Sequence, residues 1–152
     1  MTAEAFVPPD FEPPTYLDND LFVLEPLGPQ HNDSDHAAWT SSIEHIRATP
    51  GYQDGSWPPR DGMSLEANLA DLRRHAADFA VHSGFTFTVL DPADRDVIGC
   101  VYLYPTRSTD HDVTVQSWVR ADRSDLDTPL ADAVATWLAA EWPWQRPDRC
   151  GR

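Results

Sequence analysis

The sequence predicts an α+β fold in which helices flank a mixed, mostly antiparallel central sheet. Residues 85–90 (FTFTVL) alternate like a strand, and residues 97–104 (VIGCVYLY) form a nearly continuous apolar strand after an Asp-Pro turn. Residues 113–119 (VTVQSWV) again carry β-branched and aromatic residues. Apolar stripes at helical spacing run over 65–79 and 130–138. Such elements bury their apolar sides by packing in layers.

The composition is that of one folded domain. Hydrophobic residues make up 41% of the 152 residues, and six residues are Trp. No apolar run reaches the roughly 20 residues that span a bilayer, and MTAEAFVPPD is unlike a signal peptide, so we expect a cytoplasmic protein. The two cysteines, Cys100 and Cys150, form no disulfide framework and no metal motif.

The charge of the chain restricts its partners. There are 25 acidic and 11 basic residues, which gives a formal net charge of −14. Such a surface repels phosphate backbones and anionic membranes, so the sequence predicts neither nucleic-acid binding nor membrane binding. It would attract a cationic amine, although an acidic surface also serves solubility alone.

Residues 1–20 contain four prolines among acidic residues and should form an extended arm, either loose or lying across the domain or a partner subunit. A single domain should follow over residues 21–152, and its first strand is expected at 21–24 (LFVL). The polar cluster at 32–35 then begins a helical segment that Pro50-Gly51 ends. Its crowding at a helix start favours capping over metal binding.

A long helix is expected from its cap, Ser64, to about Ser83, with Gly84 in the left-handed conformation after it. Residues 73–75 (RRH) should face outward. The buried stripe is predicted to consist of Leu65, Leu69, Leu72, Ala76 and Phe79. In the strands that follow, Gly99 indicates a bulge or a close backbone approach.

Alternation within 113–119 places Gln116 and Trp118 on one face of a strand and Val119 on the other. A polar loop, 120–127, follows, and Thr128-Pro129 is a typical helix start with Thr128 as N-cap. Free N–H groups and the helix dipole at such a start attract anions.

The order of strand, two helices, three antiparallel strands, loop and helix resembles the GNAT superfamily of N-acetyltransferases over about residues 21–145. The resemblance is carried by LFVLEPL before a helix that contains Trp39, by FTFTVLD paired with DVIGCVYLYP, and by SWVR before the loop. GCVYLYP and WVR are similar to a subgroup of short bacterial GNAT-like proteins. The resemblance implies the GNAT acyl-CoA N-acyltransferase fold. It also implies transfer of an acetyl group from acetyl-CoA to a small or cationic amine by direct attack.

The resemblance also implies a coenzyme site. In the family, the strand matching 116–120 offers backbone groups to the pantetheine arm, and loop amides with the helix start hold the pyrophosphate. The matching residues of this chain are Gln116, Trp118, Val119, Arg120, Arg123, Ser124 and Thr128. Alternatives remain: pairing with aspartates for the two arginines, capping for Thr128, and core filling for Trp118.

Family members form the acceptor pocket from the segment that matches residues 44–57. Glu44 is the candidate base or ligand for a cationic amine, and His45, Tyr52 and Trp57 are candidate substrate contacts. Tyr104 is the candidate acid, since no tyrosine follows it in the chain. The alternatives are an exposed helix position for Glu44 and packing beneath a helix for Tyr104.

The loop departs from the family pattern Arg/Gln-x-x-Gly-x-Gly/Ala. Residues 120–127 (RADRSDLD) contain three aspartates and no glycine. Glycine at such a loop lets the backbone approach a phosphate closely. Two other functions therefore stay open. One is a GNAT-like module that binds acyl-CoA or another ligand without turnover. The other is a homodimeric interaction protein that uses the Trp-rich C-terminal helix and the arm.

Overall fold

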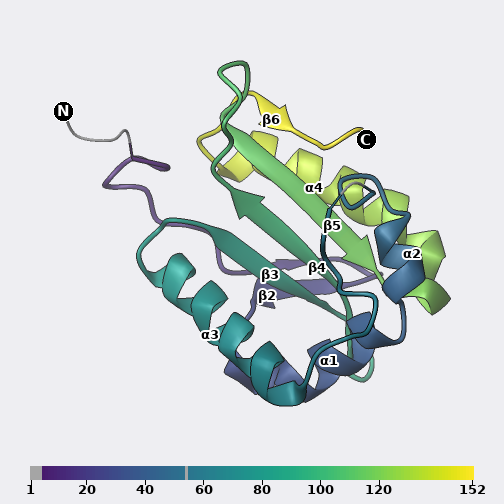
Figure 1. The fold of residues 1–152 in the computed structure, drawn as a ribbon. Coiled ribbons are helices and arrows are strands. Elements are labelled where there is room, and N and C mark those ends of the chain that lie inside the picture. Colours follow the sequence, from purple (N-terminus) through teal and green to yellow (C-terminus); the bar gives the residue numbers. More distant parts are fainter. Residues whose placement is uncertain (1–4, 54) are drawn as a thin grey trace.

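The computed structural model describes residues 5–53 and 55–152, so residues 1–4 of the predicted arm lie outside the described part (Figure 1). The strands, in chain order, are β1 (Leu17–Asp18), β2 (Val23–Pro26), β3 (Phe85–Leu90), β4 (Val97–Tyr104), β5 (Val113–Val119) and β6 (Pro147–Asp148). The helices are η1 (Pro29–His31), α1 (Asn32–Thr40), α2 (Ile43–Arg47), α3 (Leu65–Ala80), η2 (Ala121–Leu126) and α4 (Asp127–Glu141).

The strands form one six-stranded sheet in the order β1-β2-β3-β4-β5-β6. Every neighbouring pair is antiparallel except β5 and β6, which run parallel and pair only at Val113–Pro147 and Thr114–Asp148. The predicted mixed sheet with flanking helices is therefore confirmed.

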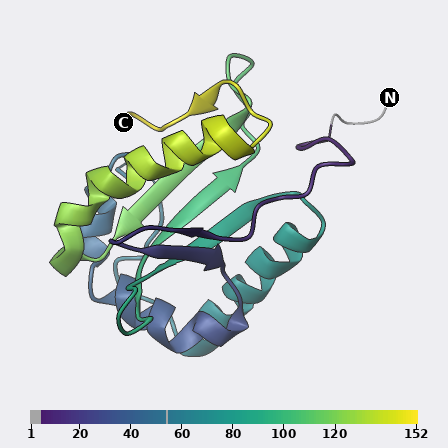
Figure 2. The same cartoon turned by 180° about the vertical axis from the view of Figure 1, so that it is seen from behind.

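Each face of the sheet carries its own apolar core, because side chains alternate along a strand. One face packs against α4, which crosses it as Figure 2 shows, and its core contains Phe87, Val119 and Trp137. The opposite face lies beneath α1 and α3, and its core contains Trp39 and Trp118 (Figure 1). None of the described helices is long and apolar enough to cross a membrane.

Several predicted boundaries need correction. The arm contains a short strand, β1, because the Asn19 side chain accepts hydrogen bonds from the Leu21 and Phe22 amides and turns the chain back onto β2. The strand expected at 21–24 lies at Val23–Pro26. The first helical segment is broken into α1 and α2. Helix α4 begins at Asp127, so Thr128 lies in its first turn and is not its N-cap.

Two glycines are explained by close approaches. At Gly99, a Cβ would overlap the backbone carbonyl oxygen of Trp118 on β5, and the pairing of β3 with β4 shifts register beside it, as the sequence predicted. Gly84 does not adopt the predicted left-handed conformation, which is found at His82 (φ 60°). Its Cβ would overlap the ring of Tyr104.

The described part of the arm lies across its own domain. Phe6 stacks on Trp144 with ring centroids 4.8 Å apart, and the indole N–H of Trp144 donates to the Phe6 carbonyl at 3.1 Å. Phe11 packs on Trp142 at 5.7 Å. These contacts place the arm on the C-terminal Trp-Pro-Trp sequence, whereas homodimerisation stays a prediction.

Candidate functional site

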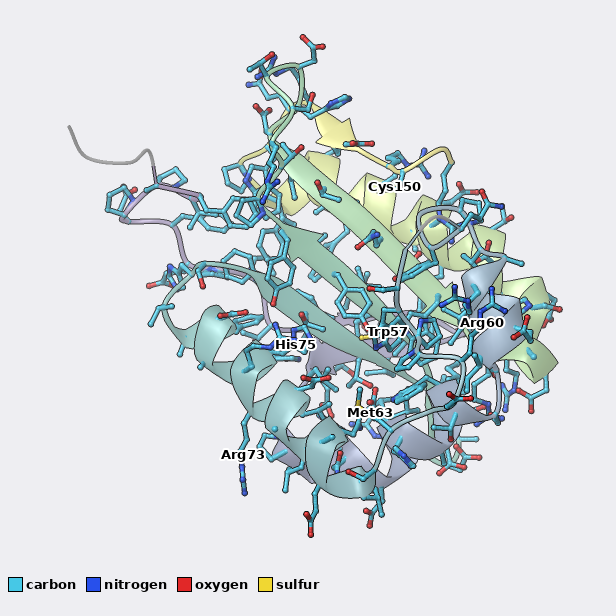
Figure 3. The ribbon with its side chains drawn as sticks, in the orientation of Figure 1. Trp57, Arg60, Met63, Arg73, His75 and Cys150 are labelled. Carbon is cyan, nitrogen blue, oxygen red and sulfur yellow. The ribbon has the colours of Figure 1, made fainter. Side chains whose placement is uncertain are left out.

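Helix α3 turns a polar and aromatic edge toward the sheet. Its buried residues are Asn68 and Leu72, whereas Leu65, expected in the core, is 45% exposed. The actual stripe is rotated relative to the predicted one, so His75 points toward the sheet while Arg73 points away (Figure 3). The prediction that His75 faces solvent was therefore wrong.

Asn68 joins α3 to α1. Its amide oxygen accepts from the Trp39 indole N–H at 3.0 Å. Its amide nitrogen donates to Asn32 Oδ1 at 2.8 Å and to Asp35 Oδ2 at 3.1 Å. A buried amide with all these partners fixes the spacing of the two helices. That spacing sets the position of Asp35 inside the fold.

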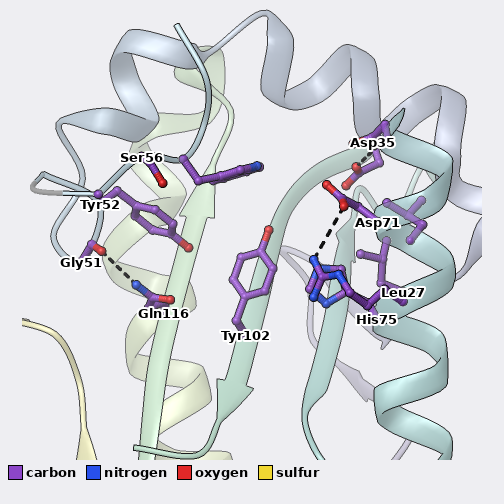
Figure 4. A pocket seen from close by; sticks show the side chains of 14 residues that line it. Leu27, Asp35, Gly51, Tyr52, Ser56, Asp71, His75, Tyr102 and Gln116 are labelled. Carbon is purple, nitrogen blue, oxygen red and sulfur yellow. Dashed lines mark hydrogen bonds and ion pairs between the residues drawn. The ribbon is translucent and has the colours of Figure 1, made fainter. Parts of the chain in front are cut away.

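A pocket of about 340 Å³ lies between α3, the sheet and the loop after α2 (Figure 4). The loop forms its lid through Gly51, Tyr52, Gly55, Ser56 and Trp57. The remaining lining residues are Leu27, Asp35, Asn68, Asp71, Leu72, Arg74, His75, Tyr102 and Gln116. We call this the lid pocket. Its size, and the aromatic rings that lie beside converging polar groups, suit a small-molecule site.

Two carboxylates line the lid pocket. Asp35 is 4% exposed, and burial raises its pKa to about 6, although Asn68 and the nearby His31 and His36 act in the opposite direction. Asp71 also raises the Asp35 pKa by charge repulsion, and it pairs with Arg74 at 3.7 Å. The cap predicted for the 32–35 cluster was wrong: α1 shows no side-chain cap within the described residues, and Asp35 faces the pocket.

The raised pKa of Asp35 predicts a measurable pH dependence of stability. The folded chain holds this proton up to about pH 6, whereas the unfolded chain releases it near 3.8. Its stabilising effect is therefore complete below 3.8 and lost as the pH rises through 6. In wild type the free energy of unfolding should therefore fall by about 3 kcal/mol across this pH range, and in Asp35→Asn this fall should be absent.

Urea denaturation of wild type, Asp35→Asn and the exposed neighbour variant Asp33→Asn between about pH 4 and 8 would measure this effect. The difference between wild type and Asp35→Asn should change with pH, while Asp33→Asn follows wild type. Parallel curves for wild type and Asp35→Asn would contradict the prediction.

His75 is held as a neutral imidazole. Its Nδ1 lies 2.9 Å from both Tyr104 Oη and Thr86 Oγ1. Tyr104 donates its proton to Asp78 at 2.9 Å, so its oxygen faces His75 as an acceptor and Nδ1 must carry a hydrogen. The other ring nitrogen, Nε2, then has a lone pair, and no residue in the described ranges bonds to it. Burial lowers the pKa of His75 to about 4.

Two phenols complete the lid pocket. Tyr52 is 5% exposed, and its hydroxyl has no hydrogen-bond partner among the described residues. Tyr102 accepts the Trp118 indole N–H at 3.1 Å. Burial raises the pKa of both phenols well above the ordinary value, so both are protonated at neutral pH. Figure 4 shows both hydroxyls directed into the pocket.

The residues predicted for the acceptor site divide into two groups. Tyr52 and Trp57 line the lid pocket. Glu44 does not, because its side chain is 81% exposed on α2 and lies 3.8 Å from Arg60. His45 lies on α2 outside the lining, and its buried Nε2 has no partner in the described chain. Tyr104 lies beyond His75, bonded to Asp78, and burial raises its pKa to about 12.

The residues predicted for the coenzyme on β5 face different surroundings. Gln116 donates to the Gly51 carbonyl at 2.9 Å and thereby fastens the lid to the sheet. Trp118 is fully buried against α1, in agreement with core filling, and Val119 is buried on the α4 face. Beyond Thr114 the outer edge of β5 is not paired with β6. There the Arg152 guanidinium donates to the Ser117 carbonyl at 3.1 Å.

Arg152 also forms a forked pair with Asp127 at the start of α4, at 2.7 and 2.9 Å. The loop before this helix is η2, and several of its polar groups already have partners, some within the loop and some outside it. Arg120 pairs with Asp122 at 2.8 Å and Arg123 with Asp91 at 2.8 Å, as the pairing alternative predicted. The Ala121 amide donates to the Ser42 hydroxyl at 2.9 Å.

The hydroxyl groups of Ser124 and Thr128, also predicted to contact phosphate, belong to exposed residues. Further amides of this region are bonded as well: Arg123 donates to the Arg120 carbonyl at 2.9 Å, and Asp127 donates to the Ser124 carbonyl. The loop therefore offers an anion fewer free N–H groups than the sequence suggested.

With this sheet, the parallel sixth strand and the pocket beneath the lid, the chain has the fold of the GNAT N-acetyltransferases. Known structures support this assignment. The ribosomal-protein-S5-alanine acetyltransferase of Vibrio fischeri matches with a TM-score of 0.63 and 15% identity over 82% of this chain and 67% of that one. RimL, a ribosomal alpha-N-protein acetyltransferase, matches with a TM-score of 0.61 and 10% identity over 82% of this chain and 64% of that one.

The microcin C7 self-immunity acetyltransferase MccE, solved with acetyl-CoA and AMP, matches with a TM-score of 0.60 and 10% identity over 80% of this chain. The match covers 62% of MccE, so this chain spans about two thirds of the length of these proteins or less. The sequence matches no protein-family model and no curated protein. At these identities the comparisons show the fold.

Sequence reasoning missed four pocket residues: Asp35, Asp71, His75 and Tyr102. It predicts a cap at 32–35 and an outward-facing His75, and it gives no role to Asp71 or Tyr102. The signal for two of them, Asp71 and His75, was present. Asn68, Asp71, Leu72 and His75 recur at intervals of three or four, which places them on one side of α3.

Proposed function

We propose that the protein transfers an acetyl group from acetyl-CoA to the amine of a small cationic acceptor bound in the lid pocket. One observation carries the proposal. The pocket reaches Gln116 on β5, where the outer edge of that strand is no longer paired with β6, and a buried phenol without a partner, Tyr52, lies at the same place. A phenol placed there suits a reaction that needs a proton.

The strand edge is compatible with a pantetheine arm, since its backbone groups beyond Thr114 are not used by another strand in the described chain. The Arg152 guanidinium on the Ser117 carbonyl would have to move away. The start of α4 would then be open to an anion, with Arg120, Arg123 and Arg152 as the nearby cations. Each of these arginines would exchange an aspartate for phosphate.

When bound, the coenzyme supplies an acetyl thioester. In the transfer, a bond forms between the amine nitrogen and the acetyl carbon, and the carbon–sulfur bond breaks. The acceptor nitrogen loses one proton to solvent when its ammonium group becomes a neutral amine, and it loses a second when the amide forms. The departing sulfur gains one proton, and the second proton from nitrogen restores the donor through solvent. Tyr52 Oη–H is the group we assign to give the sulfur its proton, because burial keeps it protonated and no described residue competes for it.

The test is an acetylation assay with purified protein, acetyl-CoA and a panel of primary amines, read by release of the coenzyme thiol and by the mass of the product. We expect a mass increase of one acetyl group on at least one amine. Absence of thiol release above buffer across the panel would refute the proposal.

A second function is favoured by the loop. The hydrogen-bonded amides of η2 and its paired arginines suit a module that binds an amine in the lid pocket without turnover. Calorimetry with acetyl-CoA distinguishes the two functions. Amine binding without coenzyme binding would support the module, whereas coenzyme binding in the micromolar range supports the transferase.

A further inference from the structure

The lid pocket is polar in an asymmetric way. Figure 4 shows Asp35, Asp71 and His75 on one side of Tyr102, and Tyr52 and Gln116 on the other. The first side, the acidic end, combines two carboxylates with a neutral imidazole. The second side, the phenol end, lies against β5 and its unpaired edge.

The acidic end offers hydrogen-bond acceptors to a primary ammonium group, which has three N–H donors. Asp35 uses Oδ2 for Asn68, and no described residue donates to its other oxygen. His75 offers the lone pair of Nε2, because Nδ1 is bonded to Tyr104 and Thr86. Asp71 supplies the third acceptor and a full negative charge.

Arg74 is the one cation that lines this end in the described chain. It lies 3.7 Å from Asp71 and 4.0 Å from Asp78, and its side chain is 57% exposed. An exposed pair of this kind contributes little and can exchange partners. A ligand ammonium group could therefore take its place beside Asp71.

Aromatic rings form the passage between the two ends. The rings of Trp57 and Tyr102 are 6.3 Å apart between centroids, and those of Trp57 and Tyr52 are 6.0 Å apart. Faces of such rings attract cations and also pack against a methylene chain. The passage thus suits a slender apolar linker with a charged group at its end.

The phenol end supplies an independent indication of a ligand. Tyr52 Oη is buried, lines the pocket and is unsatisfied within the described residues. A buried hydroxyl without a partner costs free energy unless a ligand or water bonds to it. An amine nitrogen at this end would provide that bond.

From these features we infer that the lid pocket binds a linear diamine, with one ammonium group at Asp35, Asp71 and His75 and the second amino group beside Tyr52. A monoamine would occupy one end and leave the other without a partner. The acetylation of the second amino group rests on the proposed function, whereas the binding of the diamine does not. The acidic end would thereby select the substrate and set the distance to the reacting nitrogen.

The test is calorimetry without coenzyme, with 1,4-diaminobutane as the probe and 1-aminobutane as its matched monoamine. We expect the diamine to bind at least about ten-fold more tightly, because its second amino group bonds to the buried Tyr52 hydroxyl, which the monoamine leaves without a partner. Asp71→Asn should weaken diamine binding by about ten-fold, and it should also weaken the binding of the monoamine, whose single ammonium group would occupy the same acidic end. Glu66→Gln, an exposed change on the same helix, should leave both unchanged.

Equal affinity for the two amines, or diamine binding unaffected by both Asp71→Asn and Asp35→Asn, would overturn the inference. Circular dichroism of each variant would show that it is folded. The two proposals fail separately. Diamine binding without acetyl transfer would refute only the transferase, and equally efficient acetylation of monoamines would refute only the diamine preference.

Discussion

Replacement of Gly99 by alanine should destabilise the fold by about 3 kcal/mol or more, the upper range for overpacking of a core. The added Cβ would overlap the Trp118 carbonyl oxygen across the β4–β5 pair, and this neighbour is backbone that cannot turn aside. The strands would have to separate at the centre of the sheet. The bulge beside Gly99 would also be disturbed, since Val89 faces Gly99 at the register shift.

Urea denaturation followed by far-UV circular dichroism measures the effect. Gly55→Ala is the matched control, because the nearest atoms to its Cβ would lie 3.8 and 3.9 Å away, which is ordinary contact. We expect that control to change the free energy of unfolding by at most about 0.5 kcal/mol. If Gly99→Ala were as stable as Gly55→Ala, the close approach would not constrain the residue.

The strands were the part of the fold that local pattern could predict. The two strands at 85–90 and 97–104 have the predicted bounds, and Gly99 was assigned its close approach from its place inside an apolar strand. Alternation depends only on neighbouring residues, and each strand is buried on at least one face. Register and burial therefore leave a direct trace in the sequence.

The candidate site left a weaker trace, because it is assembled from segments far apart in the chain. Asp35 is one of several acidic residues near a helix start, and nothing local distinguishes it from an N-cap. Its burial follows from Asn68, which lies 33 residues away. For His75, a modest rotation of the α3 stripe decided between solvent and pocket. A polar residue next to the boundary of an apolar stripe can belong to either side.

For the loop and helix start predicted to hold the coenzyme, sequence-based prediction meets a different limit. The order of elements predicted which strand, loop and helix lie together, and the fold confirms that order. It did not predict that Arg152 would pair with Asp127, or that the Ser42 hydroxyl would accept a hydrogen bond from the Ala121 amide. Such contacts depend on side-chain geometry between distant segments. They decide whether the loop is open to phosphate.

Replacement of Tyr52 by phenylalanine should lower kcat for acetyl transfer by about 100-fold, the usual contribution of a positioned acid. The ring would keep its packing on Trp57 while the proton at Oη is lost. Because this hydroxyl has no partner in the described chain, its removal should leave the free energy of unfolding unchanged or slightly increased. A structural tyrosine with satisfied bonds would show the opposite pattern.

Steady-state kinetics and urea denaturation of wild type, Tyr52→Phe and the exposed control Tyr16→Phe would separate these effects. Loss of kcat with unchanged stability, and with coenzyme binding within about two-fold of wild type, would support proton donation by Tyr52. If Tyr52→Phe retained full kcat, the proton would have to come from elsewhere in the lid pocket. Tyr102 would then be the remaining phenol, although its oxygen already accepts the Trp118 indole N–H. If kcat fell about 100-fold in Tyr102→Phe and not in Tyr52→Phe, the proton donor would be Tyr102 on the sheet and not Tyr52 in the lid.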